Sequence, residues 1–329
     1  MFDDKKLLIT GGTGTFGKNF TKRILNEYNP KKIIIYSRDE YKQSLMQKQF
    51  EKNANKIIFF IGDVRDRKRL FRVFDGVDIV IHAAALKQVP TTEYNPIEAV
   101  KTNIYGTECI IDAAIDKGVK KVIALSTDKA VNPINLYGAT KLVSDKLFIA
   151  GNAYTMDKDT SFSVVRYGNI AGARGSVIPF FKSLVEKKEN SIPITDSRMT
   201  RFWMTPDDAV ELVIKAIENS QGGEIFVPKC ASFKITDLAK AIKNDYEMDN
   251  IGIRPGEKLH EVMIAEEDSR TTYEYNDYFI IYPSLNWWKE TNMNHNGKKV
   301  EENFRYSSNN NIYLNVEEIR GLLNKMDVI

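Results

Sequence analysis

The sequence has few of the residues that build disulfide frameworks or metal sites. Its 329 residues include two cysteines and three histidines. Cys109 and Cys230 are far apart and have no neighbours at a metal-ligand spacing, which favours free thiols in a reducing compartment and predicts a cytoplasmic protein without a metal site. His82 closes an apolar stretch, and we expect it to be a hydrogen-bonded core histidine rather than a ligand.

Long apolar runs and an excess of one charge are missing as well. No apolar stretch approaches the roughly 18 residues that a membrane-spanning helix needs, and the chain opens without the pattern of a secretory signal. The net charge of +3 is evenly spread, which argues against nucleic acid and anionic membranes as partners. A chain that is 43% hydrophobic and 28% charged is expected to be globular in water, without membrane insertion.

Short apolar stretches alternate with helical patterns through the first half of the chain. This alternation predicts βαβ units, and therefore an α/β fold with a Rossmann-type, doubly wound parallel sheet over residues 1–171. The stretches expected as buried strands are residues 7–10, 33–36, 57–61, 77–82, 122–125 and 162–166.

The pattern changes at residue 172. Irregular loops, short strands and isolated helices follow, which indicate a smaller α+β substrate-binding domain with a C-terminal extension over residues 172–329. A segment near residues 204–228 is expected to return to the main sheet, with a helix over 206–219 that has proline in its first turn. Trp287 and Trp288 in the tail are expected to pack against the body or a partner subunit.

A glycine-rich turn follows the first strand and precedes a helix. In this context it is a dinucleotide fingerprint, because glycines let the backbone turn tightly and approach a pyrophosphate at the helix N-terminus. The residues expected to contact the cofactor here are Gly11, Thr13, Gly14, Thr15, Phe16 and Gly17.

The end of the second strand bears on the choice between NAD and NADP. An acidic residue at this place takes the ribose 2′-hydroxyl of NAD, and a basic one accommodates the 2′-phosphate of NADP. Asp39 keeps NAD possible, whereas the hydroxyl of Ser37 and the cations of Arg38 and Lys42 together suit a phosphate dianion. We expect NADP, with NAD as the less favoured alternative.

The ends of the next two strands supply further expected cofactor contacts. Asp63 follows the third strand, where its carboxylate can accept from an adenine amino group. Ala83, Ala84 and Ala85 follow the fourth strand, and small side chains there let a cofactor lie close to the backbone.

Candidate catalytic residues lie in the stretch from Ser126 to Lys141, after the fifth strand. Asn135 is a suitable N-cap for a helix in which Tyr137 and Lys141, four residues apart, lie on one face. An ammonium beside a phenol favours the phenolate, so Tyr137 can act as a base. Asp128 and Lys129, on the preceding loop, add a second acid/base pair.

These motifs resemble the extended short-chain dehydrogenase/reductase superfamily. Within it, the chain is similar to the configuration-inverting UDP-N-acetylglucosamine 4,6-dehydratases, which begin pseudaminic acid synthesis for bacterial surface glycans. The stretches that carry this likeness are residues 10–17, 36–40, 60–66, 83–87, 125–141, 165–169, 174–179, 196–203 and 251–261.

The resemblance implies a role for each candidate catalytic residue. Tyr137 takes the proton of the sugar C4 hydroxyl as hydride moves to NADP⁺, Lys141 lowers the pKa of Tyr137 and binds the nicotinamide ribose, and Thr127 bonds the C4 oxygen. Lys129 then removes the C5 proton, Asp128 protonates the departing C6 hydroxyl, and hydride returns to C6.

The resemblance also implies the remaining ligand contacts. Val64, Lys87 and Asn103 complete the expected cofactor site, and the chain is expected to be a homo-oligomer, a dimer or a hexamer. The residues implied around the UDP-sugar are Lys87, Asn169, Val177, Thr195, Met199, Arg201, Arg254 and Glu257.

Other functions stay open at this point. Capsule-type dehydratase/5-epimerases resemble the chain over most of its length but often lack the tyrosine that Tyr137 supplies. A UDP-sugar 4-epimerase would use Tyr137 and Lys141 without needing Asp128 and Lys129. A non-catalytic NADP-binding regulator usually has a broken Tyr-x-x-x-Lys pair, which is intact here.

Overall fold

The computed structural model describes residues 1–156, 158–173, 175–284 and 296–326. Trp287 and Trp288 lie outside the described residues. Within these ranges, no helix is both long and apolar enough to cross a membrane. Both cysteines are free, and His82 is buried with its Nδ1 2.8 Å from the Thr10 hydroxyl, which confirms it as a core histidine.

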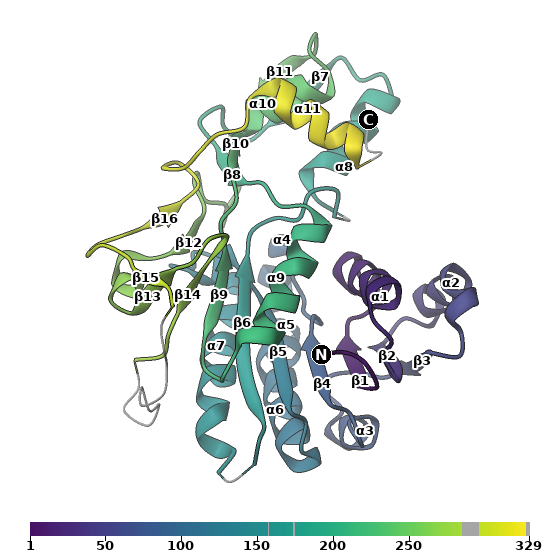
Figure 1. The fold of residues 1–329 in the computed structure, drawn as a ribbon. Coiled ribbons are helices and arrows are strands. Elements are labelled where there is room, and N and C mark those ends of the chain that lie inside the picture. The colour runs from purple at the N-terminus through teal and green to yellow at the C-terminus, as the bar shows by residue number, and fades with distance from the viewer. Residues whose placement is uncertain (157, 174, 285–295, 327–329) are drawn as a thin grey trace.

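The main feature of the fold is a ten-stranded sheet (Figure 1). The strands from β3 to β9 across the sheet pair in parallel, and β14, β13 and β15 continue it antiparallel. In order across the sheet, the strands are β15 (Lys298–Lys299), β13 (Thr272–Glu274), β14 (Tyr278–Ile281), β9 (Ile225–Pro228), β6 (Ser161–Tyr167), β5 (Lys121–Thr127), β4 (Ile79–His82), β1 (Lys6–Thr10), β2 (Lys32–Ser37) and β3 (Ile57–Ile61).

Helices cover both faces of this sheet, as the Rossmann-type prediction requires. One face carries α3, α6 and α7, and the other carries α1, α2 and α9. Their bounds, with the short helices that precede α6, are α1 (Thr15–Glu27), α2 (Glu40–Gln49), α3 (Arg67–Val73), α4 (Val89–Tyr94), α5 (Pro96–Val100), a π-helical turn (Lys101–Tyr105), α6 (Gly106–Lys117), α7 (Leu136–Gly151) and α9 (Pro206–Asn219).

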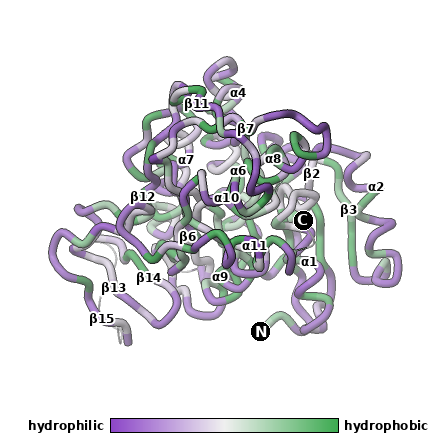
Figure 2. Tube along the Cα trace, turned by 90° about the horizontal axis from the view of Figure 1, so that it is seen from above, coloured by the Kyte–Doolittle hydropathy of each residue, from purple (hydrophilic) through white to green (hydrophobic). Residues whose placement is uncertain are grey.

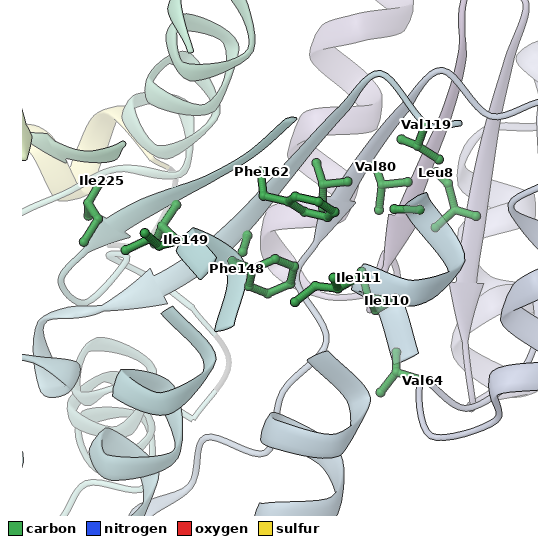
Figure 3. Packing of buried hydrophobic residues seen from close by; sticks show 14 of the residues in the cluster. Leu8, Val64, Val80, Ile110, Ile111, Val119, Phe148, Ile149, Phe162 and Ile225 are labelled. Atoms are coloured by element: carbon green, nitrogen blue, oxygen red, sulfur yellow. The ribbon is translucent and has the colours of Figure 1, made fainter. Parts of the chain in front are cut away.

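Alternation along the buried strands fills the two core layers. Val80 of β4 belongs to the same layer as Ile110 of α6 and Phe148 of α7 (Figure 3). Its neighbour Ile81 belongs to the opposite layer, which holds Phe20 of α1. In Figure 2 the strands β2 and β3 are largely hydrophobic and the outer helix α2 is largely hydrophilic, as expected for a sheet enclosed by amphipathic helices.

A smaller lobe lies at one end of the sheet (Figure 1). Its core joins α8, α10 and α11, so the C-terminal helix is part of the lobe rather than a free tail. The lobe and the short strands beside it comprise α8 (Val177–Glu186), β7 (Ser191–Ile194), β8 (Thr200–Phe202), β10 (Ser232–Lys234), α10 (Ile235–Ile242), β11 (Glu247–Asn250), β12 (Val262–Ile264), β16 (Tyr306–Ser307) and α11 (Val316–Lys325).

Candidate active site

One cleft, about 670 Å³ in volume, opens where the parallel strands end. Its wall is built from the loops that follow β1, β2, β3, β4, β5 and β6, together with the start of α7. This is the edge at which open α/β sheets bind ligands. The loops that were predicted from the sequence to bind ligands therefore lie on one continuous surface.

The glycine turn after β1 forms a cradle that side chains would fill. Gly11 has a φ of +64°, and a Cβ there would lie 2.9 Å from the backbone nitrogen of Ala84. A Cβ on Gly17 would lie 2.3 Å from the carbonyl oxygen of Gly12. The close approach of α1 and of the loop after β4 leaves no room for side chains there, and the N-cap Gly14 makes no side-chain cap, so the backbone N–H groups of the first turn of α1 suit a dinucleotide pyrophosphate.

Most of the predicted cofactor residues line this cleft. They are Gly11, Thr13, Gly14, Thr15, Phe16, Gly17, Ser37, Arg38, Asp39, Lys42, Asp63, Val64, Ala83, Ala84, Ala85, Lys87, Tyr137 and Lys141. Asn103 is the predicted cofactor residue that does not line the cleft. Its amide instead pairs with the backbone of Leu86, at 2.8 and 2.9 Å, and so supports the wall from behind.

The acidic side chains near the expected adenosine already have partners. Asp39 caps α2 by accepting from the Lys42 backbone at 2.9 Å and pairs with the Lys42 ammonium at 2.6 Å. Asp63 is held by the Arg65 guanidinium at 2.7 Å; although burial raises the pKa of Asp63, the hydrogen bonds from Arg65 outweigh burial and lower it. Arg38 is half exposed beside the cleft.

The candidate catalytic residues meet where β5 joins α7. Thr127 ends β5, Asp128 and Lys129 form a 3₁₀ turn, and Asn135 caps α7 by accepting from the Gly138 backbone at 2.8 Å, which confirms the predicted cap. Thr127, Lys129, Tyr137 and Lys141 all line the cleft. Asp128 does not line it.

Asp128 lies directly beneath two of the lining residues. Its carboxylate is 1% exposed and accepts from the Thr127 hydroxyl at 2.9 Å and from the Lys129 ammonium at 3.0 Å. Burial, reinforced by the charge of Glu261, raises the pKa of Asp128 above its usual range. Asp128 is thus suited to hold a proton, as a general acid must.

The environment of Tyr137 corrects one detail of the sequence prediction. Burial raises the pKa of Tyr137 to about 12, and the largest opposing influence is the charge of Lys129, followed by a hydrogen bond with Thr127. Lys141, to which the prediction gave this role, is itself buried, with its ammonium 3.5 Å from the Ser144 hydroxyl and its pKa lowered by burial. The Tyr137 phenol therefore responds chiefly to the cation on the neighbouring loop.

The predicted sugar-binding residues divide into two groups. Lys87 and Asn169 line the cleft, and the Asn169 amide oxygen accepts from Lys129 at 3.2 Å. The residues outside its wall are Val177, Thr195, Met199, Arg201, Arg254 and Glu257.

The residues outside the wall are held by other contacts. Met199 is buried in the core of the lobe. The Arg201 guanidinium donates to the backbone carbonyls of Thr200, Lys258 and Leu259. Arg254 and Glu257 close a turn, with 3.6 Å between their charged groups, as their spacing predicts. Both terminal nitrogens of Arg201 are therefore engaged by backbone groups in this structure.

Sequence reasoning missed one charged residue of the site, Glu261. It is 2% exposed, and its carboxylate lies 3.3 Å from the Lys129 ammonium. The apolar run after it indicates a strand, but only the fold reveals that this strand begins beside Lys129. Gln88, Thr91, Tyr167 and Ser176 also line the cleft without having been predicted.

Comparison of the sequence with known protein families supports the assignment of this cleft as an active site. The family described as polysaccharide biosynthesis proteins matches residues 7–283. The chain belongs to this family.

The chain is 53% identical to the UDP-N-acetylglucosamine 4,6-dehydratase (inverting) of Campylobacter jejuni, over 98% of both chains. It is 42% identical to the UDP-glucose 4-epimerase of Rickettsia rickettsii, over 100% of this chain and 98% of that protein. The X-ray structure of Pen from Bacillus thuringiensis superposes with a TM-score of 0.92 at 37% identity, covering 100% of this chain and 99% of that one. The resemblance inferred from the motifs is thereby confirmed.

Proposed function

We propose that the protein is an NADP-dependent UDP-N-acetylglucosamine 4,6-dehydratase that inverts C5, a hydro-lyase whose product is UDP-2-acetamido-2,6-dideoxy-L-arabino-hexos-4-ulose. It would act in the cytoplasm and supply a nucleotide sugar for pseudaminic acid in a bacterial surface glycan. The observation that carries the proposal is the position of the Thr127 hydroxyl. It donates to Asp128 at 2.9 Å, and Thr127 lines one cleft together with Tyr137, so the acid of the dehydration and the base of the oxidation adjoin one reaction centre.

The chain's own residues divide the reaction into oxidation and dehydration. A nicotinamide held in this cleft would supply a reversible hydride acceptor for C4 and donor for C6, so no external oxidant would be consumed. Tyr137 removes the proton of the C4 hydroxyl while Thr127 positions its oxygen. The ketone formed at C4 acidifies the C5 proton. Lys129 then removes that proton, and a proton delivered to the opposite face of C5 inverts its configuration.

Asp128 and Lys129 act as a pair in the dehydration. Although burial opposes it, the charges of Asp128 and Glu261 raise the pKa of Lys129, so Lys129 starts as an ammonium. Transfer of one proton across the 3.0 Å contact from Lys129 to Asp128 yields the neutral amine that takes the C5 proton and the carboxylic acid that protonates the C6 hydroxyl. The pair is therefore active when it holds one proton.

NADP is favoured because the carboxylate of Asp39 is engaged by Lys42, whereas the exposed Arg38 guanidinium is paired with Asp63 at 3.8 Å, a long contact that it can exchange for a 2′-phosphate. We expect the wild-type protein to bind NADP⁺ more tightly than NAD⁺ in isothermal titration calorimetry. Replacing Arg38 by alanine should weaken NADP⁺ binding about tenfold to a hundredfold, the worth of one charge-assisted hydrogen bond, and should leave NAD⁺ binding nearly unchanged. Equal loss for both cofactors would contradict this assignment.

A UDP-sugar 4-epimerase is the second candidate, because the Rickettsia rickettsii relative carries that name. An epimerase needs Tyr137 as the base for hydride transfer from C4. It has no dehydration step in which Asp128 and Lys129 would serve as acid and base. Burying the Asp128 carboxylate beneath Lys129 costs desolvation free energy that an epimerase would not recover. Their presence favours the dehydratase, and also disfavours a non-catalytic NADP-binding regulator.

Product mass tests the proposal directly. Purified protein incubated with UDP-N-acetylglucosamine, without added oxidant or reductant, should yield a nucleotide sugar lighter by the mass of one water, in an amount far above that of the protein. A product of unchanged mass would indicate the epimerase. The capsule-type dehydratase/5-epimerase gives the same mass and is separated from the proposed enzyme by product stereochemistry. The expected dimer or hexamer is tested by sedimentation.

A further inference from the structure

Glu261 is a buried carboxylate in the candidate active site that the proposed mechanism does not use. One of its oxygens lies 3.3 Å from the Lys129 ammonium and 3.8 Å from the Nε of Arg201. The other oxygen is buried and has no hydrogen-bond partner in the part of the chain that the structure describes. One oxygen of Asp128 is in the same condition. A single ammonium, Lys129, thus lies within reach of two incompletely bonded carboxylates.

The backbone of Glu261 is fixed by the C-terminal part of the chain. Its N–H donates to the Ser308 hydroxyl at 2.9 Å, and its carbonyl accepts from the Ser308 backbone at 2.8 Å and from the Ser307 hydroxyl at 3.2 Å. These contacts continue the antiparallel pairing of β12 with β16. The pairing of two distant segments therefore aims this carboxylate at Lys129.

Charged groups face Glu261 from three other segments. They are Asp128 and Lys129 on the 3₁₀ turn after β5, Arg201 on β8, and Lys258 on the loop before β12. Burial raises the pKa of Glu261, but the three cations outweigh burial and lower it, so Glu261 stays ionised while the pKa of Asp128 is raised. A buried charge of this kind is costly unless it is paired.

We infer that Glu261 is a positioning residue of the active site: it holds the Lys129 ammonium together with Asp128, and its fixed charge retains the one proton that Asp128 and Lys129 share. The inference rests on the proposed function only for the reaction in which that proton is used. The effect of Glu261 on the protonation of Asp128 and Lys129 does not depend on which substrate is bound.

The consequence is a pH range of activity set by Glu261. Without its negative charge, both Asp128 and Lys129 bind protons less tightly. The pair then gains its second proton and loses its first at lower pH, so both limbs of the pH profile move to lower pH. A neighbouring buried charge commonly shifts a pKa by about one to three units.

The test compares Glu261→Gln, which keeps the shape and removes the charge, with Glu261→Asp, which keeps the charge, and with the exposed Glu267→Gln as a control. We expect the Gln variant to move the pH profile of kcat by about one unit or more to lower pH, with KM for UDP-N-acetylglucosamine changed less than about threefold. The Asp variant should restore the position of the profile, and Glu267→Gln should match the wild type. Thermal melting and NADP⁺ binding confirm that each variant is folded.

A second readout needs no substrate. The ¹³C signal of the Asp128 carboxyl, assigned with Asp128→Asn, should titrate at lower pH in Glu261→Gln than in the wild type. Unchanged titration and an unchanged pH profile would overturn the inference. If the wild-type protein does not dehydrate the sugar, the proposed function fails, while the carboxyl titration still decides whether Glu261 controls the proton on Asp128.

Discussion

Lys129→Met is expected to stop the reaction after oxidation at C4, whereas Tyr137→Phe stops it before oxidation begins. Lys129 is the base for C5, and Tyr137 is the base for the C4 hydroxyl. Removing a positioned acid or base typically costs about 10²- to 10⁴-fold in rate. Both variants should therefore lose nearly all product, but for different reasons.

The two variants are distinguished by the redox state of the bound cofactor. In Lys129→Met the fluorescence of reduced nicotinamide should accumulate after UDP-N-acetylglucosamine is added, and in Tyr137→Phe it should not. Because the Lys129 charge lowers the pKa of Tyr137, its loss raises that pKa. Oxidation at C4 needs the phenolate, so in Lys129→Met its rate should rise with pH over a higher range than in the wild type. Absence of reduced cofactor in both variants would contradict this division of roles.

Gly138→Ala should inactivate the enzyme although the residue contacts no reacting group in the proposed mechanism. A Cβ on Gly138 would lie 2.0 Å from the Lys129 carbonyl oxygen and 3.1 Å from Pro133. Either α7 or the 3₁₀ turn that holds Asp128 and Lys129, the catalytic turn, must therefore move. Overpacking of this kind costs about 1–3 kcal/mol of stability, and a displacement of about 1 Å in a catalytic group can cost about 10²-fold in rate. Urea unfolding and steady-state dehydration measure the two effects.

Gly321→Ala is the matched control. Gly321 lies inside α11, and a Cβ there meets no atom within 4 Å. Alanine in an open helical position is more favourable than glycine by about 0.8–1 kcal/mol, so this variant should be more stable than the wild type and fully active. If Gly138→Ala behaved in the same way, the close contact between α7 and the catalytic turn would not position Lys129.

The sequence predicts the parallel part of the fold because its signals are local. Residues 57–61 form β3 with the predicted bounds, and residues 206–219 form α9, where Pro206 in the first turn and the Thr205–Asp208 capping box define the start. The antiparallel strands β13 and β14 were not predicted. Each is three or four residues long. β14 forms by pairing with β9, and β13 by pairing with β14, rather than by a pattern of their own.

The site was predictable to the same extent. Glycine turns and the spacing of Tyr137 and Lys141 are local patterns, and the structure brings these residues to one cleft. The contact of Glu261 with Lys129 depends on the pairing of β12 with β16, which no local pattern reveals. That Lys129 rather than Lys141 chiefly lowers the pKa of Tyr137 likewise depends on the three-dimensional surroundings of the phenol, which spacing along a helix does not determine.

Proton NMR of the reaction in D₂O tests the central claim, that this site dehydrates UDP-N-acetylglucosamine with inversion at C5. The proposed function predicts a new C6 methyl signal, deuterium at C5 and the couplings of an L-arabino sugar in the 4-keto product. The same methyl signal with D-xylo couplings would contradict inversion, and a galacto product without a methyl group would contradict the dehydratase itself.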